Sequence, residues 1–250
     1  MSKINVNTWE PEGSSTAATM MASGDTVTLP SGATLAIASG ATLANSGTVT
    51  GIGGGFHKVT VFTTSSSAGG YSPDTGVTKI IVEVQGAGGS SGNSTASNGS
   101  SGSGAGGYAM KSLSVADTDT MTVPIGAVTA TAAGGDTKFT SVTGTSFTEV
   151  KGTGGGAGTV SSGIVNGGDG GVGSGGDLNI DGHPGAPKNA NDSNMVGASS
   201  MFGSGGVTRA DSSETGRHAS GYGAGGSGGN ANTSLGGQGT AGLVIVWEYK

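Results

Sequence analysis

The sequence predicts an all-β protein in which strand-like segments alternate with long glycine tracts, and three observations carry this prediction. Apolar and polar residues alternate in several short segments, which is the pattern of half-buried strands. No segment shows a convincing helical period of 3.6 residues. Glycine supplies 55 of the 250 residues, which is about three times its usual share. The main tracts are Gly86–Gly107, Gly152–Asp177 and Gly221–Gly242.

The composition excludes several classes of protein. The net charge is −6 and the basic residues are scattered, so we expect no nucleic-acid partner. The chain has no cysteine, which excludes a disulfide framework, a thiol nucleophile and a Cys-ligated zinc site. No apolar run approaches the ~20 residues of a membrane span, and the first residues do not resemble a signal peptide. We therefore expect synthesis in a cytoplasm and no membrane insertion.

The N-terminal residues 1–22 are polar and carry a few apolar anchors, among them Trp9. Pro11 and Gly13 interrupt any long helix. Trp9 needs a surface to pack on, which is either a partner protein or the next segment of its own chain. We interpret residues 1–22 as an attachment segment.

Residues 23–51 contain an internal repeat, in which Ser-Gly recurs every seven or eight residues. Between these turns, pairs of apolar residues alternate with polar ones, as in Leu35 and Ile37. Such short units cannot bury their apolar face alone. We expect three chains to form a slender β-prism-like stalk; the alternative is a short β-meander packed on the C-terminal domain.

Residues 52–250 are expected to form one glycine-rich β domain after a hinge at Gly51–Gly55. In the second predicted strand, Ile80, Val82 and Val84 share one face. The last predicted strand is apolar on nearly both faces, which favours a central position in a sheet. The predicted strands are Lys58–Thr63, Lys79–Gln85, Tyr108–Val115, Thr120–Ile125, Thr145–Val150 and Leu243–Tyr249.

The glycine tracts have two interpretations, extended helices packed together or low-complexity linkers. A threefold extended helix has no internal hydrogen bonds. Its backbone groups bond to neighbouring helices only where no side chain intervenes, a requirement that glycine meets. We favour a bundle of polyglycine II-like tracts, because the chain returns from them to a strongly apolar last strand.

Several motifs in order resemble the glycine-rich domain of bacteriophage tail fibres and similar virion appendages. The resemblance covers roughly residues 56–250, and the motifs are Phe62-Thr-Thr-Ser-Ser, Gly76-Val-Thr-Lys-Ile-Ile-Val-Glu-Val-Gln-Gly-Ala-Gly-Gly89, Gly104-Ala-Gly-Gly-Tyr-Ala-Met-Lys-Ser-Leu-Ser-Val115, Gly134-Gly-Asp-Thr-Lys-Phe139 and Gly237-Gln-Gly-Thr-Ala-Gly-Leu-Val-Ile-Val-Trp-Glu-Tyr249. The N-terminal Asn-Val-Asn-Thr-Trp-Glu-Pro-Glu start and the repeat also resemble short structural proteins of phages from aquatic bacteria. The resemblance implies a glycine scaffold whose variable loops contact the host surface.

Two polar interruptions of the tracts, residues 177–202 and 207–220, carry the candidate binding side chains. Aromatic, arginine and amide groups at loop tips are typical of a binding surface; the alternative is that they only cap the bundle. The candidates for receptor contact are His183, Asn191, Met195, Met201, Phe202, Arg209, Arg217, His218 and Tyr222.

Motifs for catalysis or metal binding are weak. His57, His183 and His218 show no metal-ligand spacing, and we interpret them as surface or loop residues. No serine occupies a nucleophile elbow. Asp177, Asn179 and Asp181 match the first half of a calcium loop, and Asp169 is a further possible ligand. Lys188 stands where the bidentate glutamate belongs, so the alternatives are a loose divalent-cation site or a polar turn. We expect no other cofactor.

Together these features lead to one expectation and two alternatives. The expectation is a non-catalytic, homotrimeric virion fibre protein, which contacts other virion proteins through its N-terminus and a bacterial polysaccharide or outer-membrane protein through its loops. The first alternative is a capsid decoration or tail-assembly protein without a receptor. The second is a glycan-degrading enzyme, which requires a pair of carboxylates.

Overall fold

A computed structural model describes residues 55–95, 98–189, 195–207, 215–230 and 234–250, without the side chains of residues 67–69. These residues belong to one compact unit of the chain, Gly53–Lys250. The predicted attachment segment 1–22, the repeat stalk 23–51 and most of the hinge lie outside the described residues. The described residues contain no helix that is long and apolar enough to cross a membrane.

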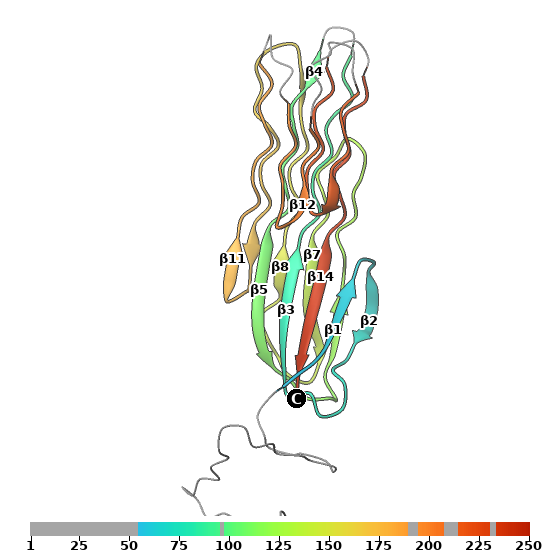
Figure 1. The fold of residues 1–250 in the computed structure, drawn as a ribbon, viewed down its shortest axis with the longest axis vertical. Helices are drawn as coiled ribbons and strands as arrows, with labels where there is room; N and C mark the ends of the chain where they lie inside the picture. Colours follow the sequence, from blue (N-terminus) through green and yellow to red (C-terminus); the bar gives the residue numbers. More distant parts are fainter. Residues whose placement is uncertain (1–54, 96–97, 190–194, 208–214, 231–233) are drawn as a thin grey trace, which may run out of the picture. The chain divides into compact units, whose positions relative to one another are not determined.

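The described unit is all-β, as predicted, and its strands form two larger sheets and two small ribbons (Figure 1). The strands are β1 (Phe56–Phe62), β2 (Ser66–Tyr71), β3 (Lys79–Gln85), β4 (Gly99–Ser100), β5 (Tyr108–Ser114), β6 (Thr120–Val123), β7 (Thr137–Thr143), β8 (Val150–Gly152), β9 (Val160–Ser161), β10 (Gly173–Ser174), β11 (Leu178–Ile180), β12 (Phe202–Ser204), β13 (Ser220–Tyr222) and β14 (Leu243–Tyr249).

The first sheet has the order β1-β14-β3-β5-β11 and the second has the order β10-β8-β7-β6-β2. The ribbons are β12-β13 and β4-β9. All of these strand pairs are antiparallel. The last strand, β14, pairs with β1 on one side and β3 on the other, so the predicted interior position is confirmed.

The inner faces of the two sheets share one hydrophobic core. Ile80, Val82 and Val84 of β3 are fully buried in it, which confirms that they share one face. From the second sheet, Phe139 of β7 and Val150 of β8 enter the same core. A sheet whose strands place side chains alternately on two faces buries one face in this way.

Predicted and observed strands agree closely at β1, β3, β5, β6 and β14. The prediction of a strand at Thr145–Val150 is wrong, because only Val150 is in a strand, the first residue of β8. Phe147 in this segment reaches the core from a loop, where it stacks on Phe139 with ring centroids 5.8 Å apart. Residue 147 is therefore apolar because it packs against the core from a loop, and not because it lies in a strand.

Beyond the sheets, the glycine-rich segments run side by side as long extended stretches (Figure 1). The segment 100–107 shows how they are joined, because N–H groups three residues apart donate to the same neighbouring segment. In the first series, the N–H groups of Ser100, Ser103 and Gly106 donate to the carbonyls of Gly229, Gly226 and Gly223, respectively. In the second, Ser101, Gly104 and Gly107 donate to Thr159, Gly156 and Thr153. In the third, Gly102 and Ala105 donate to Ala186 and His183.

The carbonyl groups of the same segment accept hydrogen bonds from further neighbours. Gly89 donates to Gly104, and Ala198 donates to Ser103. Segment 86–94 repeats the spacing of three toward one partner: Gly88, Ser91 and Ser94 donate to Thr240, Gly237 and Ser234. The backbone groups of these segments are therefore satisfied between segments and not within them.

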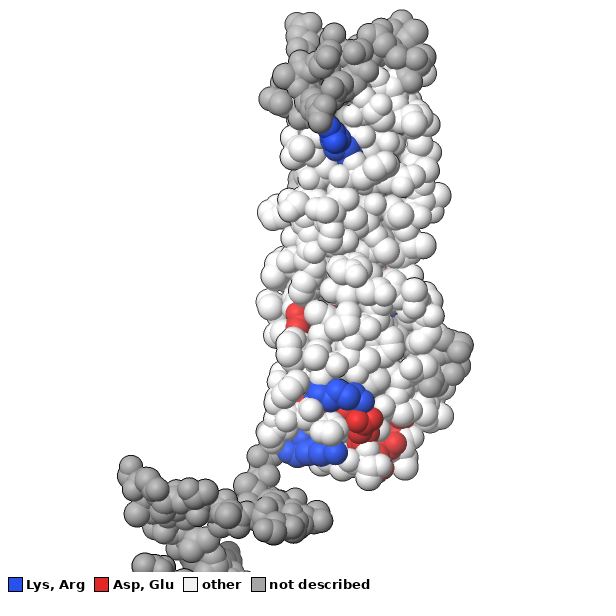
Figure 2. Space-filling model, turned by 45° about the vertical axis from the view of Figure 1, so that its right-hand side comes forward, with Lys and Arg blue, Asp and Glu red and all other residues white. Residues whose placement is uncertain are grey.

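Side chains would not fit between these backbones. A Cβ built on Gly104 would lie 1.9 Å from the carbonyl oxygen of Asp169, and one on Gly88 would lie 1.9 Å from that of Ala224. Among the described residues, few charged groups interrupt the glycine segments. Figure 2 shows that, on the face drawn, Lys, Arg, Asp and Glu gather mainly at the end opposite the glycine segments.

Candidate functional site

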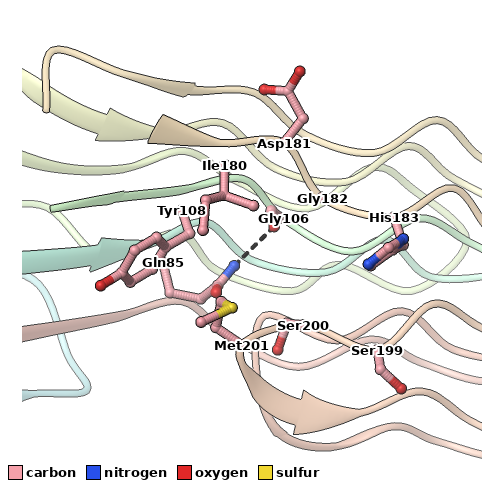
Figure 3. Close-up of a pocket in the computed structure, with 10 residues that line it drawn as sticks. All are labelled: Gln85, Gly106, Tyr108, Ile180, Asp181, Gly182, His183, Ser199, Ser200 and Met201. Carbon is pink, nitrogen blue, oxygen red and sulfur yellow. Dashed lines mark hydrogen bonds between the residues drawn. The ribbon is translucent and has the colours of Figure 1, made fainter. Parts of the chain in front are cut away.

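A pocket of about 160 Å³ opens where the first sheet meets the glycine segments (Figure 3). Three parts of the chain line it: the end of β3 with the start of β5, the residues at and after the end of β11, and the residues before β12. The lining residues are Gln85, Gly106, Tyr108, Ile180, Asp181, Gly182, His183, Ser199, Ser200 and Met201.

Gln85 forms the floor of the pocket and is 1 % exposed. Its Nε2 donates to the carbonyl oxygens of Gly106 at 2.8 Å and Gly107 at 3.2 Å. Its Oε1 is buried and has no hydrogen-bond partner among the described residues. A buried acceptor without a donor costs free energy.

The walls around Gln85 combine apolar and aromatic groups. Ile180 is 37 % and Met201 is 58 % exposed. Tyr108 is held in place, because its hydroxyl donates to Glu83 at 2.8 Å and its ring lies 6.0 Å from that of Phe202. Burial and the bond to Glu83 raise the pKa of Tyr108, which therefore stays a neutral donor.

Several polar groups at the rim of the pocket already make hydrogen bonds within the chain. Ser200 Oγ donates to the carbonyl of Tyr222 and accepts from the N–H of Phe202. Ser199 Oγ accepts from the N–H of Gly205. The Asp181 carboxylate points away from Gln85 and Met201 (Figure 3) and accepts from the N–H of Gly173 at 3.3 Å. The pocket thus offers the His183 imidazole and an apolar wall formed by Ile180 and Met201.

The structure brings four of the predicted receptor-contact residues to this pocket or next to it. His183 and Met201 line the pocket. Phe202 packs on Tyr108, which belongs to the lining. Tyr222 pairs with Phe202 across the β12-β13 ribbon. Residues from both polar interruptions, or directly beside them, therefore meet in space.

His218 lies in a second pocket, also of about 160 Å³. Its Nδ1 accepts from the N–H of Gln238 at 2.9 Å, which leaves Nε2 to carry the proton of the neutral ring. Thr131 lines the same pocket and has a φ of 59°, which is strained for a β-branched residue. The exposed Arg217 precedes His218, and its N–H donates to Ser227 Oγ.

One further predicted contact residue, Met195, is placed differently. Met195 is 1 % exposed, so its side chain is part of the interior and is not available to a receptor. The surrounding glycine segments bury it, since a Cβ on Gly228 would lie 2.7 Å from the Cβ of Met195. Asn191 and Arg209 lie outside the described residues.

The residues of the predicted cation site belong to a strand and not to a loop. Asp177, Asn179 and Asp181 lie on or beside β11. In an extended chain, the Cα atoms of residues four positions apart, such as Asp177 and Asp181, are separated by about 13 Å. Asp177 accepts from the Ser112 N–H at 2.9 Å, and Asn179 bonds the backbone of Gly176. The Ser112 N–H and nearby Lys111 hold the pKa of Asp177 below its ordinary value. One ion cannot contact all three side chains.

Gln85 and Tyr108 are site residues that the sequence did not predict. Gln85 is the last residue of a strand in which side chains alternate between two faces. It is an even number of residues from Lys79 and Glu83, so it lies on the same face as they do. Nothing in this local pattern indicates that the glycine segments bury it. The only signal is a long polar residue directly before a glycine tract.

Comparison with models of known protein families finds no match, and comparison with curated proteins finds no significant similarity. The fold and the pocket are therefore the basis for assigning a function.

Proposed function

We propose that this chain is a non-catalytic virion fibre protein that binds a bacterial surface receptor, a polysaccharide or an outer-membrane protein. The observation that carries the proposal is the pocket around Gln85. Residues of the first interruption, 177–202, line this pocket on a glycine scaffold. The motif resemblance to tail-fibre domains supports the same function.

We further propose that the glycine tracts form a polyglycine II-like bundle. The hydrogen bonds that repeat every third residue in segments 86–94 and 100–107 support this arrangement, because three residues complete one turn of such a helix. A backbone bonded on several sides holds its position without a large apolar core. The scaffold would then keep the pocket residues in fixed places, which lowers the entropy lost on binding.

The chemistry of the pocket favours a sugar over a charged ligand. Saccharides present CH faces that pack on groups such as Ile180 and Met201, and hydroxyl groups that suit the His183 imidazole. The pocket is small, about 160 Å³, so it would contact only a short part of a polysaccharide, and affinity at one site is expected to be weak. Several chains in one fibre would raise the avidity through their effective concentration.

The test is binding of the purified full chain to lipopolysaccharide, capsular polysaccharide and outer-membrane vesicles of candidate hosts. We expect Met201→Ala and His183→Ala to weaken binding about tenfold, the effect of losing roughly 1.4 kcal/mol of contact. Ile164→Ala is the matched control, because Ile164 is 73 % exposed and lines neither pocket.

Exchange of residues 183–202 and 207–220 between related fibres should alter host range without unfolding the protein. If the pocket variants and these chimaeras bind and adsorb as the wild type does, the adhesin function is excluded.

A further inference from the structure

A second cluster of polar groups lies at the opposite end of β3 and β14 from the Gln85 pocket. His57 comes from β1, Asp74 from the connection between β2 and β3, and Glu248 from β14. Glu248 pairs with Ile80 near the start of β3, whereas Gln85 ends that strand. One ligand atom from each of His57, Asp74 and Glu248 lies within 4.8 Å of the other two.

An irregularity in β1 brings His57 into this cluster. The register of β1 against β14 shifts between Phe56 and Lys58, so His57 is the extra residue of a bulge. A bulge redirects a side chain that regular alternation would send to the other face. As a result, both His57 and its neighbour Lys58 contact Asp74: His57 Nε2 lies 3.1 Å and Lys58 Nζ lies 2.8 Å from Asp74 Oδ2.

Glu248 is the unusual member, because its side chain is fully buried. Its Oε1 accepts from the Tyr71 hydroxyl at 3.0 Å, and Lys58 Nζ lies 3.7 Å from it. Its Oε2 is buried without a hydrogen-bond partner among the described residues. A buried carboxylate oxygen of this kind is costly unless a donor or a cation reaches it. The Glu248 carboxylate can therefore accept a further contact.

We propose that His57, Asp74 and Glu248 form a binding site for a divalent transition-metal ion of the Zn²⁺ class. One imidazole nitrogen and two carboxylates are ligands that Zn²⁺ accepts in proteins. Glu248 supplies one carboxylate oxygen, which lies within 4.8 Å of the ligand atoms of His57 and Asp74. The two ligands at the rim, His57 and Asp74, have side chains 29 % and 44 % exposed, which gives an ion access from solvent.

Lys58 acts as an internal competitor for this site. Its ammonium group now lies close to Asp74 and Glu248, in the region that a cation would occupy. Its side chain is 40 % exposed, so it can turn to solvent when an ion binds. Metal binding would connect β1, the β2–β3 connection and β14, and would therefore stabilise the part of the unit that follows the N-terminal residues.

The experiment titrates the full-length protein, freed of metal with a chelator, with Zn²⁺ and with Co²⁺. We expect a Zn²⁺-dependent rise in Tm and visible Co²⁺ absorption bands from an imidazole–carboxylate site. His57→Gln should weaken the affinity for Zn²⁺ at least tenfold. Removing even a residue that only hydrogen-bonds to a metal ligand typically costs this much, and His57 would be a ligand itself. His218→Gln is the matched control, since it removes an exposed histidine elsewhere, and it should leave Zn²⁺ binding unchanged.

Lys58→Met tests the competitor role. This variant should bind Zn²⁺ more tightly than the wild type, and Zn²⁺ should raise its Tm by more. If wild type and His57→Gln respond equally to both metals, or if neither responds, the site is excluded. Weaker Zn²⁺ binding by Lys58→Met would overturn the role of Lys58 as a competitor.

Discussion

Asp119 shows at the residue scale how one side chain connects distant segments. It is 2 % exposed, and its two oxygens accept from the N–H groups of Ala116 and Thr145, both at 3.0 Å. Burial by itself raises the pKa of Asp119, but the hydrogen bonds from Ala116 and Thr145 outweigh burial and hold the pKa below its ordinary value. The charged form therefore stabilises the fold.

We predict that Asp119→Asn lowers the free energy of unfolding at pH 7 by about 1–3 kcal/mol, because one N–H loses its acceptor. A carboxyl with a depressed pKa stabilises the folded state above its unfolded pKa, about 3.9, and this stability is lost as the pH falls through the folded pKa. The difference between wild type and Asp119→Asn should thus shrink between pH 5 and pH 2. Urea unfolding across this range measures it, with the exposed Asp117→Asn as control. A difference that does not change with pH would contradict the role of the charge.

At the scale of elements, strands and glycine segments are specified by different properties. The strands β3 and β14 follow from alternation and apolar content, which are local properties that sequence reveals. The strand β2 was not predicted because its sequence, Ser-Ser-Ala-Gly-Gly-Tyr, has little alternation. The glycine segments depend on which backbone lies next to which, as Gly104 and Asp169 show. Composition predicts this close approach in general, but it does not predict the partners.

We predict that Gly104→Ala destabilises the protein by about 1–3 kcal/mol or more, because the added methyl group overlaps the carbonyl of Asp169. Gly163→Ala is the matched control in the same kind of tract, since its nearest non-neighbour atom, Ser161 Oγ, lies 4.0 Å from the added carbon. This control should stay within about 1 kcal/mol of the wild type. Chemical denaturation measures both, and equal effects would show that packing of the tracts does not stabilise the unit.

The whole molecule combines the described unit with an N-terminal part whose sequence indicates assembly. The repeat at residues 23–51 presents pairs of apolar residues that a single short unit cannot bury. Weak binding at one pocket becomes useful when several pockets act together. We therefore propose that receptor binding and trimer formation are separate properties of separate parts of the chain.

We predict that the full-length protein sediments as a trimer of 23.5 kDa chains. The double variant Leu35→Asn, Leu43→Asn should lower the oligomeric state, because both residues belong to the apolar face of the repeat. Ala36→Asn, on the alternate face, is the control. Analytical ultracentrifugation gives the result, and a monomeric wild type would rule out the trimeric stalk.

The sequence by itself determined the all-β class, the positions of most of the long strands and the need for closely packed glycine backbones. These properties depend on local periodicity and composition, which are read along the chain. Tertiary structure alone decided that Gln85, His183 and Met201 meet in one pocket, that Met195 is buried, and that a bulge turns His57 toward Asp74 and Glu248. Such meetings depend on the register between segments far apart in sequence, and a one-residue change in register would move every side chain to a different neighbour.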